Sequence, residues 1–400
     1  MNVLPEIREK LEVLGLQELK ENFFSRANEV DAAFRFPHEN FDDIVSRNLH
    51  TLPLDEQFGG RNYGFERTFD TLVEMASGCP STALCMAMHY YTLAGLSRIP
   101  DNPMLQKMFQ DIYEGGEFIS SFNQPNVMSQ FNKASGFELV KVKIDKVEGG
   151  YLINGRKNFV SGSERFKYLP VYGYQEGTKS KLGMTALMVT RDDPGVEIKT
   201  AWNLSAMKAS MSHHVDMKDV FVPEDRLIGR EGYGVEDTNE LSYWSRLAIS
   251  AVYQGIARSA VDHTIAIMKR KRDLYSQTNL AMMPGAQFTL ADMKIQLEVA
   301  SNQLRGFARQ GDEERAAGEF TDDLFQKSLI TKYHVTNTAN EIVRLAMHVE
   351  GMASLNQGGL LERLHRDVRA ATFHQPTDDL LKEILAKRTL GVVTLRNRWN

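Results

Sequence analysis

The stretch IVRLAMHVEGMASLNQGGLLERLHRDVRAATFHQPTDDLL, residues 342–381, carries the clearest structural pattern in the chain. Its apolar first part predicts a helix that ends in a glycine-containing turn at Gly351. After a second glycine pair, apolar residues recur at helical spacing from Leu361 to Val368 and predict a short amphipathic helix. The sequence His-Gln-Pro-Thr, residues 374–377, follows as a polar turn.

The composition is that of an ordinary globular protein. Of the 400 residues, 42% are hydrophobic and 25% are charged, and this length predicts about two to three domains. The net charge of -5 disfavours a nucleic-acid-binding surface. Cys79 and Cys85 make no disulfide framework and no metal set, and the N-terminus has no apolar leader, so we expect a metal-free cytoplasmic protein. The uncharged run from Met75 to Ser97 contains Pro80 and many polar residues, which indicates a loop and a buried helix rather than a membrane span.

The period of the hydrophobic pattern changes twice along the chain. Residues 1–115 have helical spacing, residues 116–230 contain alternating stretches, and residues 231–400 return to helical spacing. We therefore expect an α+β protein, mostly helical, with these three segments as its domains. Within the middle segment, Gly149-Gly150 predicts a hairpin. The predicted strands are residues 140–145, 151–155, 169–174, 185–190 and 214–222.

Six segments, in their order and spacing, resemble the motifs of the acyl-CoA dehydrogenase superfamily. They are LPLDEQFGG (52–60), DTLVEMASGCPSTALCMAMH (70–89), ISSFNQPNVMSQF (119–131), GGYLINGRKNFVSGS (149–163), MKASMSHHVDMKDVFVPEDRLIG (207–229) and the stretch quoted first. The resemblance extends over nearly the whole chain. It implies an N-terminal helical domain, a middle β-barrel-like domain and a C-terminal four-helix bundle. It also implies FAD rather than FMN between the β domain and the bundle, and a homotetramer or homodimer.

In this superfamily the hairpin at residues 149–163 supports the flavin ring. The resemblance places the aromatic residue that packs near the isoalloxazine at Phe159, and the hydroxyl that bonds to flavin N5 at Ser161. A flavin requires a flat apolar face and a donor at the atom that accepts hydride. Without the resemblance, the same residues would be interpreted as a core phenylalanine of a strand and a serine of a turn.

Further flavin contacts are implied in residues 119–131. Phe122 and Asn123 fall where the family holds the pyrimidine edge of the flavin, and Ser129 matches the serine that contacts the pyrophosphate. The segment departs from the family pattern, because Asn-Gln-Pro stands in place of Thr-Glu-Pro and a glycine is lost. Losing that glycine removes one close approach of the backbone to the cofactor.

The phosphates of the dinucleotide are implied to lie near residues of three other motifs. Lys271 and Leu274 fall on the family's Arg and Phe, although a solvated basic helix end is an equally good interpretation. Glu350 and Gly351 fall on its Gly-Gly turn, and Thr377 on the threonine of its last motif. A carboxylate at position 350 would repel a pyrophosphate. We therefore expect either a shifted cofactor or a Glu350 side chain that points away.

The catalytic base of the family is where this chain departs most. The usual glutamate falls on Gln375, and a carboxamide has no basic lone pair near neutral pH. The alternative base position falls on Ser245, which is a poor base without assistance. His89 and His374 have the pKa range for proton transfer, although either could be a structural histidine. The catalytic candidates are therefore Gln375, His374, His89 and Ser161.

Three functions follow from these observations. The first is an FAD-dependent dehydrogenase that oxidises an acyl thioester, on CoA or a carrier, by Cα proton removal and hydride transfer to flavin N5, with an electron-transfer partner. The second is a monooxygenase of the same superfamily, in which flavin reduced by a flavin reductase forms a C4a-peroxide with O₂ and no Cα base is needed. The third is a non-catalytic flavin- or acyl-binding protein. We expect the dehydrogenase, because most members of the superfamily are dehydrogenases. The monooxygenase ranks nearly as high, because the catalytic base is missing.

Overall fold

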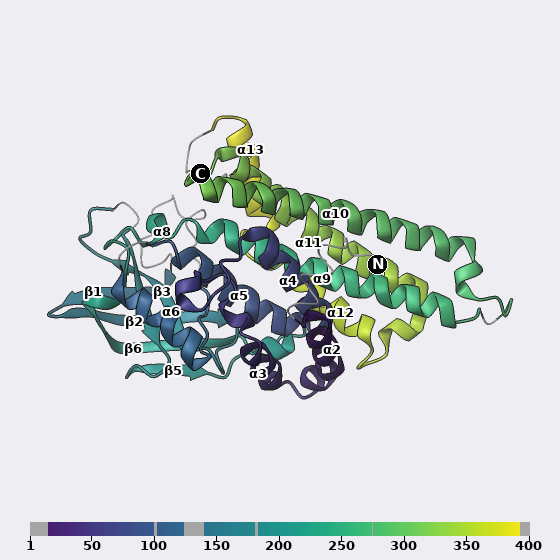
Figure 1. Cartoon of the computed structure of the whole chain (residues 1–400), viewed down its shortest axis with the longest axis horizontal. Coiled ribbons are helices and arrows are strands. Elements are labelled where there is room, and N and C mark those ends of the chain that lie inside the picture. Colours follow the sequence, from purple (N-terminus) through teal and green to yellow (C-terminus); the bar gives the residue numbers. More distant parts are fainter. Residues whose placement is uncertain (1–14, 100–101, 124–139, 181–182, 274, 393–400) are drawn as a thin grey trace.

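A computed structural model describes residues 15–99, 102–123, 140–180, 183–273 and 275–392. Along the chain, N-terminal helices are followed by one sheet and then by helices again. In Figure 1 the sheet lies at one end of the molecule, and the long C-terminal helices extend toward the other end. The expected α+β class, mostly helical, is confirmed. The domain limits near residues 115 and 230 stay a prediction.

One helix of the N-terminal region is completely enclosed. The helices of this region are α2 (Leu16–Ala32), α3 (His38–Ser46), α4 (Phe65–Gly78), α5 (Pro80–Leu96) and α6 (Pro103–Gly115). Every residue of α5 is buried, because its sequence has no polar face. Within the run from Met75 to Ser97, residues 75–78 form the last turn of α4, Cys79 joins the two helices, and the expected buried helix is α5. No helix in the described part of the chain is long and apolar enough to cross a bilayer.

Three long helices form the framework of the C-terminal region. They are α9 (Leu241–Arg270), α10 (Pro284–Ala317) and α11 (Asp322–Glu350), and they pack against one another. The shorter α12 (Leu360–Val368) packs on α9 and α11, and α13 (Asp378–Thr389) packs on α11. This arrangement agrees with the expected helical bundle.

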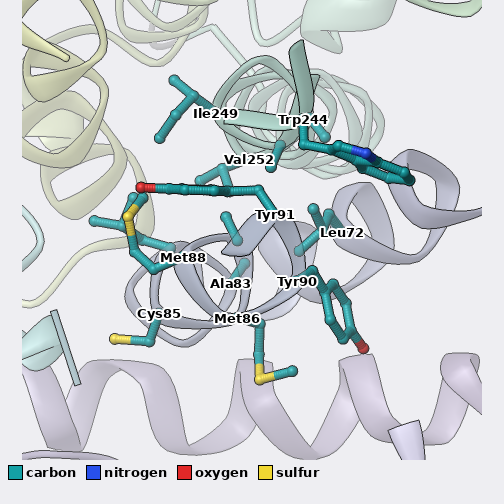
Figure 2. Packing of buried hydrophobic residues seen from close by; sticks show 14 of the residues in the cluster. Leu72, Ala83, Cys85, Met86, Met88, Tyr90, Tyr91, Trp244, Ile249 and Val252 are labelled. Atoms are coloured by element: carbon teal, nitrogen blue, oxygen red, sulfur yellow. The ribbon is translucent and has the colours of Figure 1, made fainter. Parts of the chain in front are cut away.

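Close packing of α9 against α4 and α5 forms the centre of the core. Figure 2 shows Tyr91 of α5 on the side that faces Val252 of α9, whereas Tyr90 points to the other side of α5. At Gly255, an added Cβ would lie 2.5 Å from the Cβ of Ala76, so only glycine lets α9 approach α4 this closely.

The middle region forms one seven-stranded sheet. Its strands are β1 (Val142–Val147), β2 (Gly150–Val160), β3 (Tyr168–Gln175), β4 (Met184–Thr190), β5 (Val196–Lys199), β6 (His213–Pro223) and β7 (Leu227–Ile228), in the order β5-β6-β2-β1-β3-β4-β7. Only the β1–β3 pairing is parallel among these strands. The predicted hairpin is confirmed, because Val147 pairs with Gly150 and Gly149 has a φ of 76°. All five predicted strands are confirmed, and the short β5 and β7 were not predicted.

A lysine is buried inside this region without a carboxylate partner. Lys157 of β2 is 1% exposed. Its Nζ donates to the Ser120 hydroxyl and to the Pro170 carbonyl, each at 2.9 Å. Burial lowers the pKa of Lys157 to about 7, because the charged ammonium loses its hydration. The side chain therefore ties β3 and residues 118–123 to β2 by two hydrogen bonds.

Replacing Lys157 should change the pH dependence of stability. In the unfolded chain a lysine keeps its proton up to a pKa of about 10.4, whereas folded Lys157 loses it near 7. Unfolding then takes up a proton between these values, so the wild-type free energy of unfolding should rise with pH relative to that of Lys157→Met. The slope should approach about 1.4 kcal/mol per pH unit. Urea unfolding of both proteins from pH 7.5 to 9.5 measures this difference.

The exposed Lys218 of β6 provides the control. Lys218→Met should give a curve parallel to that of the wild type. Parallel curves for Lys157→Met and the wild type would show that Lys157 stays protonated when folded.

Candidate functional site

The end of β2 presents the predicted Ser161 to a row of hydroxyl groups. Ser161 Oγ lies 2.9 Å from Ser212 Oγ, which in turn lies 2.8 Å from Ser210 Oγ. The Gly162 amide donates to the Ser210 carbonyl at 2.9 Å and holds the two segments together. All three serines are buried. Because a hydroxyl both donates and accepts, this row can orient the Ser161 hydroxyl toward a neighbouring ligand atom.

A buried aspartate fixes the same row to the C-terminal helices. Asp367 of α12 accepts a hydrogen bond from the Met207 amide at 2.6 Å, just before the turn that carries Ser210. Burial raises the pKa of Asp367 to about 6, and the neighbouring Arg363 opposes that shift. Neither Ser210 nor Asp367 was predicted from the sequence as a site residue. The Ser-Met-Ser spacing of residues 210–212 was the only signal for Ser210, and no pattern pointed to Asp367.

Phe159 presents an open aromatic face next to Ser161. Its side chain is 62% exposed, and its φ is 56°, which is rare for a bulky residue. The register of β2 and β6 shifts between Lys157 and Val160, and this irregularity turns Phe159 out of the sheet. Trp202 lies edge-on, with its ring centroid 6.3 Å from that of Phe159. An uncovered flat face beside an oriented hydroxyl fits the flavin ring implied by the resemblance.

Phe122 and Asn123 are fixed on β3. The Phe122 ring stacks on Tyr172 with the centroids 4.3 Å apart. The Asn123 side chain donates to the Tyr172 carbonyl at 2.8 Å and accepts from its amide at 2.7 Å. The Asn123 carboxamide is therefore committed to the backbone of β3. Ser129 and Leu274, also predicted to bind the cofactor, lie outside the described residues.

His89 has a backbone partner at each ring nitrogen. Its Nε2 donates to the His50 carbonyl at 2.7 Å, and its Nδ1 accepts from the Ile119 amide at 3.1 Å. The residue is fully buried, and desolvation lowers its pKa to about 3. This geometry keeps His89 neutral and leaves neither nitrogen free for proton transfer. Its role in the structure is to hold residues 118–123 against α5.

His374 forms a pair with a tyrosine of α9. Its Nε2 lies 2.8 Å from the Tyr253 hydroxyl, and Tyr253 is fully buried. The surrounding protein lowers the pKa of His374 to about 4, first by desolvation and then through the Lys332 ammonium. Burial raises the pKa of Tyr253 well above its usual value. Both groups are therefore neutral at pH 7, and no sequence pattern pointed to Tyr253 as the partner.

The position of the usual base carries no carboxylate. Gln375 directly follows His374 and has an exposed side chain. Thr377 begins α13 without a capping hydrogen bond from its side chain. At the alternative position, Ser245 donates to the carbonyl of Ser242 at 3.1 Å, within its own helix. Neither position therefore provides a group that is basic at neutral pH.

Glu350 points away from the glycine turn that it precedes. Its Oε2 lies 3.1 Å from His263 Nε2 of α9. Its carbonyl oxygen accepts from Lys271 Nζ at 2.7 Å, which brings a positive charge to the turn at Gly351. Gly351 has a φ of 74° and open space where a Cβ would stand. The Glu350 carboxylate is thus directed toward His263 of α9. This direction is compatible with a pyrophosphate near the Gly351 turn.

Two family models match this chain. Residues 129–220 match the middle domain of acyl-CoA dehydrogenase, and residues 232–390 match its C-terminal domain. The fold and these matches define a flavin-dependent oxidoreductase, a class whose members here include proteins with FAD and proteins with FMN. The chain belongs to the acyl-CoA dehydrogenase superfamily.

Relatives match over most of their length. The acryloyl-CoA reductase (NADH) of Anaerotignum propionicum is 24% identical, over 91% of this chain and 89% of the relative. The cyclohex-1-ene-1-carbonyl-CoA dehydrogenase of Geobacter metallireducens is 24% identical, over 91% and 93%. Two solved structures have the same fold. Butyryl-CoA dehydrogenase from Megasphaera elsdenii has a TM-score of 0.84 at 18% identity, over 98% and 99% of the two chains. Dibenzothiophene monooxygenase from Paenibacillus sp. A11-2 has a TM-score of 0.83 at 21% identity, over 96% and 97%.

Removing the Tyr253 hydroxyl should destabilise the protein through His374. Tyr253→Phe deletes the hydrogen bond to the half-buried imidazole, and a typical intramolecular hydrogen bond contributes about 0.5–1.5 kcal/mol. Tyr243 of the same helix is the matched control, because its hydroxyl has no hydrogen bond to the described residues. Tyr243→Phe should change the free energy of unfolding by less than about 0.5 kcal/mol. Urea unfolding at pH 7 measures both, and equal effects would show that the Tyr253–His374 contact contributes no stability.

Proposed function

We propose that the chain is a flavin-dependent monooxygenase that uses reduced flavin and O₂ to oxygenate a small organic substrate. The observation that carries this proposal is that the base position holds no carboxylate, while the histidine next to it is neutral. Gln375 and Ser245 replace the carboxylates that a dehydrogenase of this family needs, while His374 and Tyr253 form an uncharged pair beside the vacant position. Loss of a general base typically costs about 10²–10⁴-fold in rate, whereas oxygen transfer from reduced flavin does not require Cα deprotonation.

The residues of the site suit this reaction. When bound, the reduced flavin supplies two electrons, so that one oxygen atom of O₂ enters the substrate and the other leaves as water. Phe159 would cover one face of the flavin ring, and Ser161 would hold the N5 edge through the hydroxyl row. The Tyr253 hydroxyl both donates and accepts, so that with His374 it could return a proton to the departing oxygen. Because the position of the usual base carries no charge, the neutral Tyr253 hydroxyl is the group proposed to donate the proton.

The flavin is proposed to be FAD. Lys271 Nζ lies at the Gly351 turn, where the resemblance places the dinucleotide phosphates, and so would provide a cation for them. A flavin reductase is the partner that the reaction requires, because the chain must receive its flavin in the reduced form. The dibenzothiophene monooxygenase with the same fold is consistent with this chemistry.

A second candidate is an oxidoreductase acting on an acyl thioester, with an electron-transfer partner. It is favoured by the relatives that match about nine-tenths of the chain, since both are named for acyl-CoA reactions. In that case a proton acceptor other than Gln375 must serve, and His374 is the nearest candidate in sequence.

Anaerobic reduction distinguishes the two candidates. A panel of acyl-CoA thioesters of different chain length is mixed with the flavin-loaded protein without oxygen, and the absorbance of the oxidised flavin is followed. We expect no bleaching, because no base at the site can remove the Cα proton. In the complementary experiment, pre-reduced flavin protein is mixed with O₂, and we expect a transient absorbance that differs from oxidised flavin. Bleaching by any thioester would refute the monooxygenase and establish the second candidate.

Restoring a carboxylate at the vacant position tests its placement. With an acyl-CoA that binds, Gln375→Glu should raise the rate of flavin reduction by about 10²-fold or more, because it supplies the missing general base. Gln57→Glu adds the same charge at an exposed loop position of the N-terminal region and should change nothing. Stopped-flow flavin absorbance measures both variants. If Gln375→Glu keeps its flavin and binds the thioester but gains no rate, residue 375 does not face the substrate carbon.

A further inference from the structure

A charged cavity lies outside the candidate flavin site. It has a volume of about 370 Å³ and opens between the start of α4, the end of α5 and the end of α10. Three arginines line it, together with two carboxylates. None of these residues belongs to the proposed flavin or oxygen site. The charged residues are Glu66, Arg67, Arg98, Asp312 and Arg315.

Both carboxylates are already engaged by other donors. Glu66 accepts from Arg305 at 2.7 Å and from Arg309 at 3.0 Å, and neither arginine lines the cavity. Asp312 accepts from the amide of Phe65 at 2.6 Å and from that of Glu66 at 3.0 Å, so it caps the start of α4. The Glu66 carboxylate is therefore paired with arginines outside the cavity, and the Asp312 carboxylate is occupied by the backbone at the start of α4.

Each of the three guanidinium groups has N–H donors without a hydrogen-bond acceptor among the described residues. Arg315 is buried and uses its Nε for Glu240 at 3.1 Å, and its two terminal nitrogens have no acceptor among the described residues. Arg98 donates one hydrogen bond, to the carbonyl of Arg315 at 2.8 Å. Arg67 lies over the ring of Tyr63 at 5.2 Å. Neither Arg67 nor Arg98 pairs with a carboxylate in the part of the chain that the structure describes.

We propose that this cavity binds the phosphate group of a small phosphorylated ligand. Planar guanidinium groups bind oxyanions through paired N–H donors, and three arginines line this cavity. Arg315 is paired with Glu240 through its Nε, so its two terminal nitrogens remain available to an oxyanion in the cavity. The cavity is larger than a phosphate ion and reaches the lower range of small-molecule sites, about 300–1,000 Å³. The ligand therefore extends beyond its phosphate group.

The occupant would adjoin the first turn of α9. Arg315 lies over the Trp244 ring at 5.3 Å, and Glu240 accepts from both Arg315 and Trp244 Nε1. Phe65, the first residue of α4, stacks on Trp244 with the ring centroids 3.9 Å apart. Binding at Arg315 should therefore change the fluorescence of Trp244, which provides a second readout.

Calorimetric titration of the flavin-loaded, full-length protein tests the proposal. Pyrophosphate and inorganic phosphate are the probes, and acetate tests whether any oxyanion suffices. We expect saturable binding of pyrophosphate with one site per chain, weaker binding of phosphate, and none of acetate at the same concentrations. Arg67→Gln and Arg98→Gln should each weaken pyrophosphate binding by about tenfold or more, because each removes a charge-assisted contact. Both side chains are exposed, so both variants should fold.

Arg61→Gln is the matched control, since Arg61 is exposed, precedes the cavity residues in the same loop and does not line the cavity. Its affinity should equal that of the wild type. The proposal is overturned if pyrophosphate does not bind saturably, if acetate binds as tightly, or if Arg61→Gln weakens binding as much as the other two variants. The measurement requires no turnover, so its result is independent of the oxygenase proposal.

Discussion

Helix α5 imposes the constraint on which the rest of the structure depends. A helix that is apolar on all sides is stable only when protein encloses it completely, and every residue of α5 is buried. Helices α4 and α9 cover much of its surface, and the turn before β6 covers another part. Cys85 of α5 contacts the Ser210 carbonyl, and His89 holds the Ile119 amide. The enclosure of α5 thus places the hydroxyl row and residues 118–123 around one helix.

The sheet and the helices were predictable where one face of each element is buried. The alternation around β1, β2 and β6 results from one buried face, and it was visible in the sequence. The strands β5 and β7 span only four and two residues, so they are too short for alternation to appear. The connection expected between the two helices of residues 65–97 is reduced to Cys79, and Ser77 lies inside the packed end of α4. The Ser77 hydroxyl bonds to the carbonyls of Val73 and Gly255.

The candidate site was predictable only in its local parts. Phe159 and Ser161 lie in one hairpin and could be named from a single motif. Ser210 and Tyr253 come from distant segments, and only the folded chain brings them to Ser161 and His374. The partner of Glu350 could not be foreseen either, because His263 lies on α9, far from Glu350 in the sequence. The roles of these residues toward a flavin stay proposals.

The outward turn of Phe159 has a practical consequence for handling the protein. In the absence of a ligand, the Phe159 ring beside Trp202 is 62% exposed and leaves apolar surface in contact with water. Binding of a flat ligand over this ring would remove apolar surface from water, so the loaded protein should withstand handling better than the empty one.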